Sequence, residues 1–161
     1  MSKDFVLDAS PIIIMAKIGL IELIPKVADE LIIPKAVKNE IEAGIPNDPA
    51  FNWIKSSGKV FIRDVGSIEP EILKWDLGLG ETEVLSFAYK NKGFTAILDD
   101  RAARRCARAL GIKIKGTLSL LILAKKEGYI PRISLVLDKL IKAGFYVSLD
   151  LIQKAKDLAN E

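Results

Sequence analysis

Six acidic residues, far apart in the sequence, are the side chains best suited to chemistry. They are Asp8, Glu40, the pair Glu81 and Glu83, and the pair Asp99 and Asp100. Carboxylate oxygens are the ligands that Mg²⁺ and Mn²⁺ prefer. One or two such ions activate a water molecule, orient a scissile phosphate and stabilise the leaving oxygen. If these acids converge in the fold, they predict a metal site suited to phosphodiester hydrolysis.

The composition excludes most other kinds of catalytic site. The 161 residues include no histidine, which removes Ser-His-Asp and Cys-His catalysis, imidazole bases and most zinc sites. The single cysteine, Cys106, excludes an internal disulfide and is typical of a reducing, cytoplasmic setting. No apolar run approaches the roughly 18 residues that span a bilayer. We therefore expect a cytoplasmic protein without a membrane partner.

The elements that must position the acids alternate between short apolar runs and segments of helical periodicity. We expect strands over residues 5–7, 31–33, 60–62, 95–98 and 112–114, and helices that include residues 68–77, 81–92, 101–110, 118–127, 133–143 and 149–160. Ser10 should cap the first helix, with Pro11 as its first residue. This alternation predicts an α/β fold with a mainly parallel sheet of four or five strands flanked by helices. With no linker or repeat, residues 1–161 should form one domain, with 131–161 as a C-terminal helical extension packing on it.

The predicted fold brings the acids to one edge of the sheet. In a parallel sheet the carboxyl ends of all strands lie at the same edge, so Asp8 and the pair after the strand 95–98 should share it. The helix expected from Glu81 runs antiparallel to the strand that follows it, so its start returns to that edge. Glu40 reaches the same edge if its helix leans across the sheet.

Each acid also has an ordinary structural explanation. Asp8 can be a turn or cap residue at the end of its strand. Glu81 and Glu83 can complement the dipole of their helix, as first-turn acids do. The aspartates at 99 and 100 can cap the following helix, and Glu40 can be a solvated helix residue. Converging carboxylates without a partner would repel and raise each other's pKa, and a divalent cation removes that cost.

Four short motifs, taken together, resemble the PIN-domain family. They are Leu7-Asp8-Ala9-Ser10, the helix from Val37 to Ile41 with Glu40, Leu79-Gly80-Glu81-Thr82-Glu83, and Ile97-Leu98-Asp99-Asp100-Arg101. The last two motifs and Gly116-Thr117-Leu118 are similar to the prokaryotic branch related to VapC toxins. The resemblance covers roughly residues 4–130 and implies a metal-dependent ribonuclease fold with an acidic Mg²⁺/Mn²⁺ pocket.

The resemblance also implies which acids bind the metal. The four ligands, which would also be the catalytic residues, are Asp8, Glu40, Glu83 and Asp100, with Glu81, Asp99 and Ser10 in reserve. Glu83 is favoured over Glu81 because Leu79 and Ala88 then fall where the family has apolar and small residues. Many relatives have aspartate at this third position, so the glutamate leaves the ligand geometry and the number of ions open.

The function implied is a Mg²⁺- or Mn²⁺-dependent endoribonuclease, the toxin of a type II toxin–antitoxin pair. Its partners would be RNA, an antitoxin protein and a second copy in a homodimer. One alternative is a non-catalytic PIN-fold module that binds RNA or protein. A further alternative is a phosphatase-type enzyme with Asp8 as nucleophile, although such enzymes have a second aspartate where this chain has Ser10.

The positive charge of the chain lies in its second half. The net charge is −3 over residues 1–80 and +6 over residues 81–161. Arg101, Arg104, Arg105 and Arg108 recur along one predicted helix. They either hold RNA phosphates or an acidic antitoxin segment, or form an ordinary solvated face.

Overall fold

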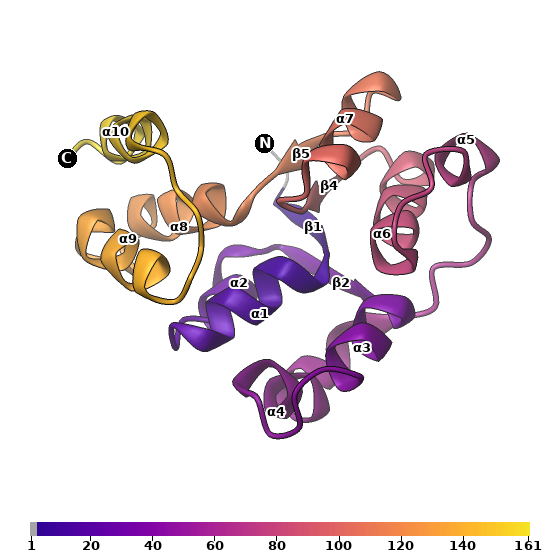
Figure 1. The fold of residues 1–161 in the computed structure, drawn as a ribbon, viewed down its shortest axis with the longest axis horizontal. Helices are drawn as coiled ribbons and strands as arrows, with labels where there is room; N and C mark the ends of the chain where they lie inside the picture. Colours follow the sequence, from indigo (N-terminus) through magenta and orange to yellow (C-terminus); the bar gives the residue numbers. More distant parts are fainter. Residues whose placement is uncertain (1–2) are drawn as a thin grey trace.

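Five parallel strands form the centre of the part of the chain that this computed structural model describes, residues 3–161 (Figure 1). They are β1 (Asp4–Leu7), β2 (Glu30–Pro34), β3 (Ile62–Arg63), β4 (Phe94–Ile97) and β5 (Ile114–Lys115), in the order β3-β2-β1-β4-β5. In the register, Phe5 of β1 pairs with Leu31 of β2 and with Thr95 of β4. The predicted α/β class with a parallel sheet is confirmed.

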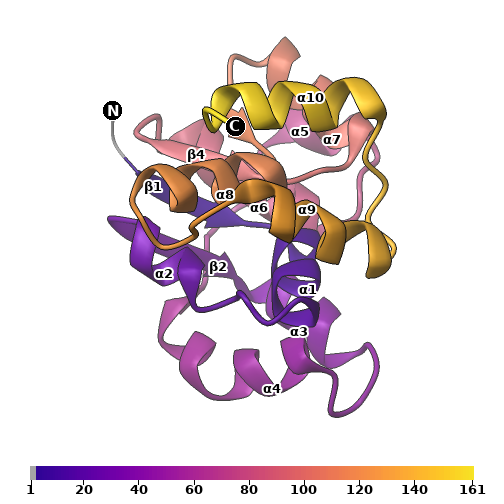
Figure 2. The ribbon, with the colours of Figure 1, turned by 90° about the vertical axis from the view of Figure 1, so that its left-hand side faces the viewer.

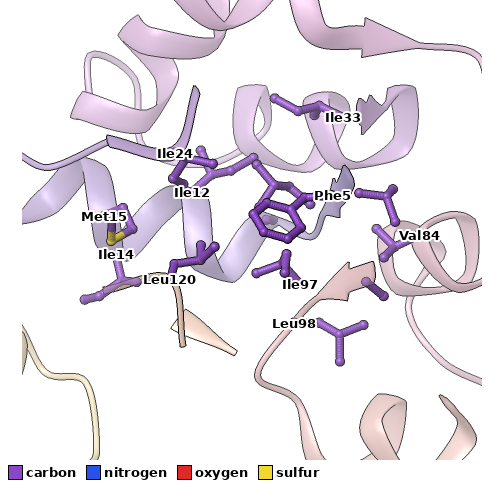
Figure 3. Packing of buried hydrophobic residues seen from close by; sticks show 14 of the residues in the cluster. Phe5, Ile12, Ile14, Met15, Ile24, Ile33, Val84, Ile97, Leu98 and Leu120 are labelled. Carbon is purple, nitrogen blue, oxygen red and sulfur yellow. The ribbon is translucent and has the colours of Figure 1, made fainter. Parts of the chain in front are cut away.

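The two central strands are apolar on both faces. Phe5, Val6, Leu7, Ala96 and Ile97 are all at most 2% exposed. A strand with continuous apolar character is typical of a parallel sheet that is covered on both sides. Figure 3 shows side chains of β1 and β4 gathered with those of the surrounding helices in one buried cluster.

Helices cover both faces of this sheet. They are α1 (Ala9–Lys17), α2 (Leu23–Val27), α3 (Lys35–Glu42), α4 (Pro49–Lys55), the 3₁₀ helix η1 (Ser57–Phe61), α5 (Pro70–Leu73), α6 (Leu79–Lys90), α7 (Arg101–Ala109), α8 (Thr117–Lys126), α9 (Ile133–Lys142) and α10 (Leu149–Leu158). The helix α6 packs against β1, β2 and β4, and α8 packs against α9 and α10. Figure 1 places α8, α9 and α10 on the opposite side of the sheet from α6, and in Figure 2 these three helices lie toward the viewer.

Two predicted boundaries in the amino-terminal half are wrong. The first helix begins at Ala9 with Asp8 as its N-cap, so Ser10 and Pro11 lie inside its first turn. The predicted strand 60–62 is reduced to Ile62–Arg63, because the preceding residues form η1. This 3₁₀ turn packs so closely on α4 that a Cβ at Gly58 would lie 2.6 Å from the ring of Trp53.

Two predicted helices also differ in length. The one expected over residues 68–77 is a single turn, α5, and Asp76 behind it adopts a left-handed backbone conformation that a helix cannot continue. The helix expected from Glu81 begins two residues earlier, at Leu79, and so includes Gly80. Glu81 therefore lies in the first turn of α6.

The last two helices pack back onto the domain. α10 contacts both α8 and α9, and the carboxylate of Glu161 accepts hydrogen bonds from the backbone amides of Ile133 and Ser134. Within residues 3–161, no helix combines the length and the apolar character needed to cross a membrane.

Candidate active site

Asp8 lies at the junction between β1 and α1. Its backbone N–H donates to the carbonyl of Ile97 in β4 at 3.0 Å, which continues the strand pairing past the end of β1. Its extended backbone makes it the N-cap of α1. The residue is only 4% exposed. The fold therefore holds a carboxylate, with little freedom, at the carboxyl edge of the sheet.

The surroundings of Asp8 oppose its ionisation. The pKa of its carboxyl is raised to about 7, mainly by burial; the backbone amide of Ala9 lowers it, and the charges of Glu81, Glu40 and Asp99 contribute to the rise. A buried carboxylate close to other acids has few ways to be stabilised except by a proton or a cation. A perturbed pKa in a cavity is typical of functional sites.

The side chain of Asp8 opens into a cavity of about 330 Å³. The other residues that line it are Ser10, Ile13, Ile14, Lys17, Glu40, Glu81, Ala143, Gly144 and Phe145. Three carboxylates from α3, α6 and the start of α1 thus share one cavity with a hydroxyl and an ammonium group. Its other walls are largely apolar.

Gly80 keeps the space between two of these acids open. A Cβ at this position would lie 3.6 Å from Oδ1 of Asp8 and 3.8 Å from Oε1 of Glu40. Because glycine has no side chain, both carboxylate oxygens face free space beside the first turn of α6. This is the kind of cradle in which an ion or a water can lie.

Glu81 brings the third carboxylate to this cavity. It lies in the first turn of α6 and is partly buried. Burial raises the pKa of its carboxyl, the charges of Asp100 and Glu40 raise it further, and the amide of Gly78 lowers it. The acids therefore form one electrostatically coupled group.

Glu83, the favoured third ligand in the sequence, lies elsewhere. Its Oε1 accepts a hydrogen bond from the backbone N–H of Ala36 at 3.1 Å, at the start of α3, and it does not line the cavity. Residues two apart in a helix point in nearly opposite directions. The structure thus brings Glu81, the reserve candidate, to Asp8 and Glu40, and gives Glu83 a structural contact instead.

The two aspartates after β4 flank the cavity without lining it. Asp100 is exposed and caps α7, where its Oδ2 accepts from the N–H of Ala103 at 2.9 Å. Asp99 accepts from both the N–H and the hydroxyl of Thr117, at 2.9 and 2.6 Å. The charge of Asp100 nevertheless raises the pKa of Glu81, and the charge of Asp99 raises the pKa of Asp8.

A comparison with protein families matches residues 4–161 to a model described as a PIN domain. The chain belongs to the PIN-domain family. The fold is accordingly of the nuclease type, as the resemblance in the sequence implied. A comparison with curated proteins finds no match.

We call the cavity that Asp8, Glu40 and Glu81 line the acidic cavity. Its carboxylate oxygens are the kind of ligand that a hard divalent cation prefers. Within residues 3–161 no three histidine, cysteine or acidic side chains are grouped closely enough to form a ready-made metal site. Magnesium, however, usually keeps several waters and is held by only one or two carboxylates together with substrate phosphates. Two carboxylates beside the space at Gly80, with a third in the same cavity, meet that requirement.

The sequence did not predict the contribution of the C-terminal helices to this cavity. Lys17 donates from Nζ to the carbonyl of Ala143 at 3.1 Å, which ties α1 to the end of α9. Phe145, two residues later, lines the cavity that Asp8 opens into. No local signal relates these residues, because more than a hundred positions separate them in the chain.

Proposed function

We propose that the protein is a Mg²⁺- or Mn²⁺-dependent endoribonuclease. Asp8, Glu40 and Glu81 would hold the ion, and Asp99 and Asp100 would add negative charge from beside the cavity. The observation that carries this proposal is the burial of Asp8 in a cavity shared with two further carboxylates. Glu81 takes the place that the sequence motif suggested for Glu83, because it lies in that cavity.

The bound ion would supply a Lewis acid and a water of lowered pKa. The chain's own residues have separate tasks. Asp8 and Glu40 would hold the ion, since one carboxylate oxygen of each lies beside the space left by Gly80. The exposed hydroxyl of Ser10 stands in the same cavity and can hydrogen-bond a water or a phosphate oxygen. Phe145, Ile13 and Ile14 form the apolar part of the wall of this cavity.

Cleavage of a labelled oligoribonucleotide tests this function. We expect cleavage with Mg²⁺ or Mn²⁺, none in excess chelator, and none by Asp8→Asn with either ion. Asp138→Asn, an exposed acid on α9, is the matched control and should cleave as the wild type does. Undiminished cleavage in excess chelator contradicts the proposal.

We further propose that the nuclease is the toxin of a toxin–antitoxin pair. The similarity of its motifs to VapC toxins supports this role. The exposed apolar side chains of the C-terminal helices support a partner, either an antitoxin or a second copy in a homodimer; they are Leu135, Ile141, Leu149, Leu151 and Leu158. Induced expression should arrest growth, whereas Asp8→Asn should not. Light scattering should give the mass of a dimer.

A non-catalytic RNA-binding module is the second candidate function. The lack of a ready-made group of three metal ligands within residues 3–161 favours it. Such a protein would bind RNA and yet cleave none with any divalent ion. The same cleavage assay therefore separates the two functions.

A further inference from the structure

A second cavity, of about 550 Å³, lies along α7. The residues that line it are Asp99, Arg101, Arg104, Arg105, Arg108, Gly116, Leu118, Ser119 and Leu151. We call it the arginine cleft. One wall is α7, another is the start of α8, and Leu151 comes from α10. Four guanidinium groups face a single lining carboxylate.

The guanidinium groups of the arginine cleft have no carboxylate partner within residues 3–161. No ion pair there includes any of the four arginines. Both oxygens of Asp99 already accept hydrogen bonds from Thr117. Arg104 is anchored by a 2.9 Å hydrogen bond from Nη1 to the carbonyl of Leu98. Arg101, Arg105 and Arg108 remain exposed.

The spacing of these arginines suits a chain of phosphates. Arg101, Arg105 and Arg108 recur about once per helical turn, roughly every 5.4 Å along one side of α7, and Arg104 stands next to Arg105. Arginine presents a planar fork of donors that binds phosphate through two parallel hydrogen bonds. Clustered like charges also repel, so a polyanion along this face removes an electrostatic cost.

The arginine cleft and the acidic cavity lie at the same edge of the sheet. Asp99 follows β4 and lines the cleft, and Asp8 follows the adjacent strand β1 and opens into the cavity. The hydrogen bond from the N–H of Asp8 to Ile97 joins the two strand ends directly. The two sites are therefore built on neighbouring strand ends.

We propose that the arginine cleft binds the phosphate backbone of RNA and holds the substrate without any divalent ion. The identification of the polyanion as RNA rests on the proposed function. Arginine clusters also recognise acidic peptide motifs, but the near-regular spacing of the arginines along α7 matches a backbone that carries one phosphate per nucleotide. The cleft thus supplies affinity, whereas the acidic cavity supplies chemistry.

Binding of RNA in excess chelator tests this site apart from cleavage. The probe is a fluorescein-labelled single-stranded oligoribonucleotide, and its anisotropy is measured over a range of KCl concentrations. The test variant is Arg105→Ala/Arg108→Ala. The matched control is Lys139→Ala/Lys142→Ala, which removes two exposed charges from α9 instead. Thermal unfolding of all three proteins checks that they are folded.

We expect the arginine variant to bind RNA at least about tenfold more weakly. The slope of log K against log salt should fall by about 1.4, at roughly 0.7 for each lost phosphate contact on a single strand. The lysine variant should change affinity less than about twofold. Equal losses in both variants would overturn the proposal, as would unchanged binding in the arginine variant.

Two further outcomes separate this inference from the proposed function. If RNA binds through the arginines but no divalent ion gives cleavage, the inference stands and the nuclease function fails. If cleavage is metal-dependent but the arginine variant has an unchanged KM, the function stands and the inference fails. Binding of a polyglutamate peptide to the cleft, with no binding of RNA, also overturns the inference.

Discussion

The acidic cavity and the arginine cleft differ in the sign of the charge that each concentrates. The cavity gathers carboxylates, and the neighbouring acids raise the pKa of Asp8 and of Glu81. The cleft gathers guanidinium groups without carboxylate partners in the described chain. Each therefore needs an opposite charge from outside the protein, a cation in one case and a polyanion in the other. Because the two regions are lined by different residues, their tasks should be separable by mutation.

Between them lie the two aspartates that follow β4. Asp99 is held by Thr117 and Asp100 by the first turn of α7, so neither is free to form a close ion pair with the arginines. Local hydrogen bonds thus keep the acidic and basic groups from neutralising each other. The opposite charges of the two regions are thus kept apart by the hydrogen bonds of Asp99 and Asp100.

The largest effect on the rate of RNA cleavage should come from replacing one glutamate of α6 by glutamine. Glu81→Gln should lower the rate of RNA cleavage by at least about 100-fold, because even the outer partners of metal ligands contribute about 10–100-fold. Glu83→Gln, two residues away on the same helix, should retain most of the activity, since its side chain contacts α3. Both variants should bind RNA in chelator as the wild type does.

The opposite ranking of these two variants would contradict the placement of the metal site. If Glu83→Gln is inactive while Glu81→Gln cleaves normally, the third ligand is Glu83, and α6 must rotate in the active protein.

The next largest effect concerns the stability of the metal-free protein. The folded pKa of Asp8, about 7 against an ordinary 3.8, means that the native state binds this proton more tightly than the unfolded chain. The free energy of unfolding should therefore fall as pH rises from about 4 to about 7, and level off above that. Asp8→Asn should lose this dependence and be more stable than the wild type at pH 8, by a few kcal/mol, since each pKa unit is worth about 1.4 kcal/mol.

Urea unfolding at several pH values in chelator measures this difference. At pH 8, added Mg²⁺ should stabilise the wild type and leave Asp8→Asn unchanged. A wild type whose stability rises between pH 4 and pH 7 more than that of the variant would contradict the assigned environment of Asp8.

A smaller effect should follow from releasing Asp99. Thr117→Val keeps the shape of a fully buried side chain but removes the hydroxyl that donates to Asp99 at 2.6 Å. The free energy of unfolding should fall by about 1–3 kcal/mol, the usual cost of a lost hydrogen bond to a charged or buried group. Asp99 should then turn toward Arg104 and weaken RNA binding slightly. Unchanged stability would show that the hydroxyl contributes little.

The smallest effect is the stability change in Glu83→Gln. The neutral side chain can still accept from Ala36, but the negative charge at the start of α3 is lost. Such charges at helix termini contribute about 0.3–1 kcal/mol at low salt. Urea unfolding at low and high salt measures it, and a loss above 2 kcal/mol would indicate a larger role for Glu83.

The acids at strand ends could be predicted from the sequence. Short apolar runs that lead directly into Asp8 and Asp99 imply buried parallel strands, and parallel strands deliver such residues to one edge. The lack of histidine restricted the chemistry to oxygen ligands. These inferences depend only on local patterns and on the geometry of a parallel sheet, and the confirmed parallel α/β fold follows from them. The PIN family, in contrast, was implied by the resemblance of the motifs and is shown by the family comparison.

The choice between Glu81 and Glu83 could not be predicted in the same way. It depends on where α6 begins, and glycines at 78 and 80 suggested an interrupted chain. Gly80 instead lies inside α6, where its backbone packs beside Asp8 and Glu40. The contact between Lys17 and Ala143 was equally hidden, since it joins elements through tertiary packing alone.

Binding of Mn²⁺, measured by electron paramagnetic resonance at pH 8, tests the central claim most directly. The wild type should bind the ion, and Asp8→Asn should lose at least about tenfold in affinity. The Arg105→Ala/Arg108→Ala variant should bind it as the wild type does, because the arginine cleft has no part in holding the metal. Equal Mn²⁺ affinity in the wild type and Asp8→Asn would contradict the assignment of the acidic cavity as the metal site.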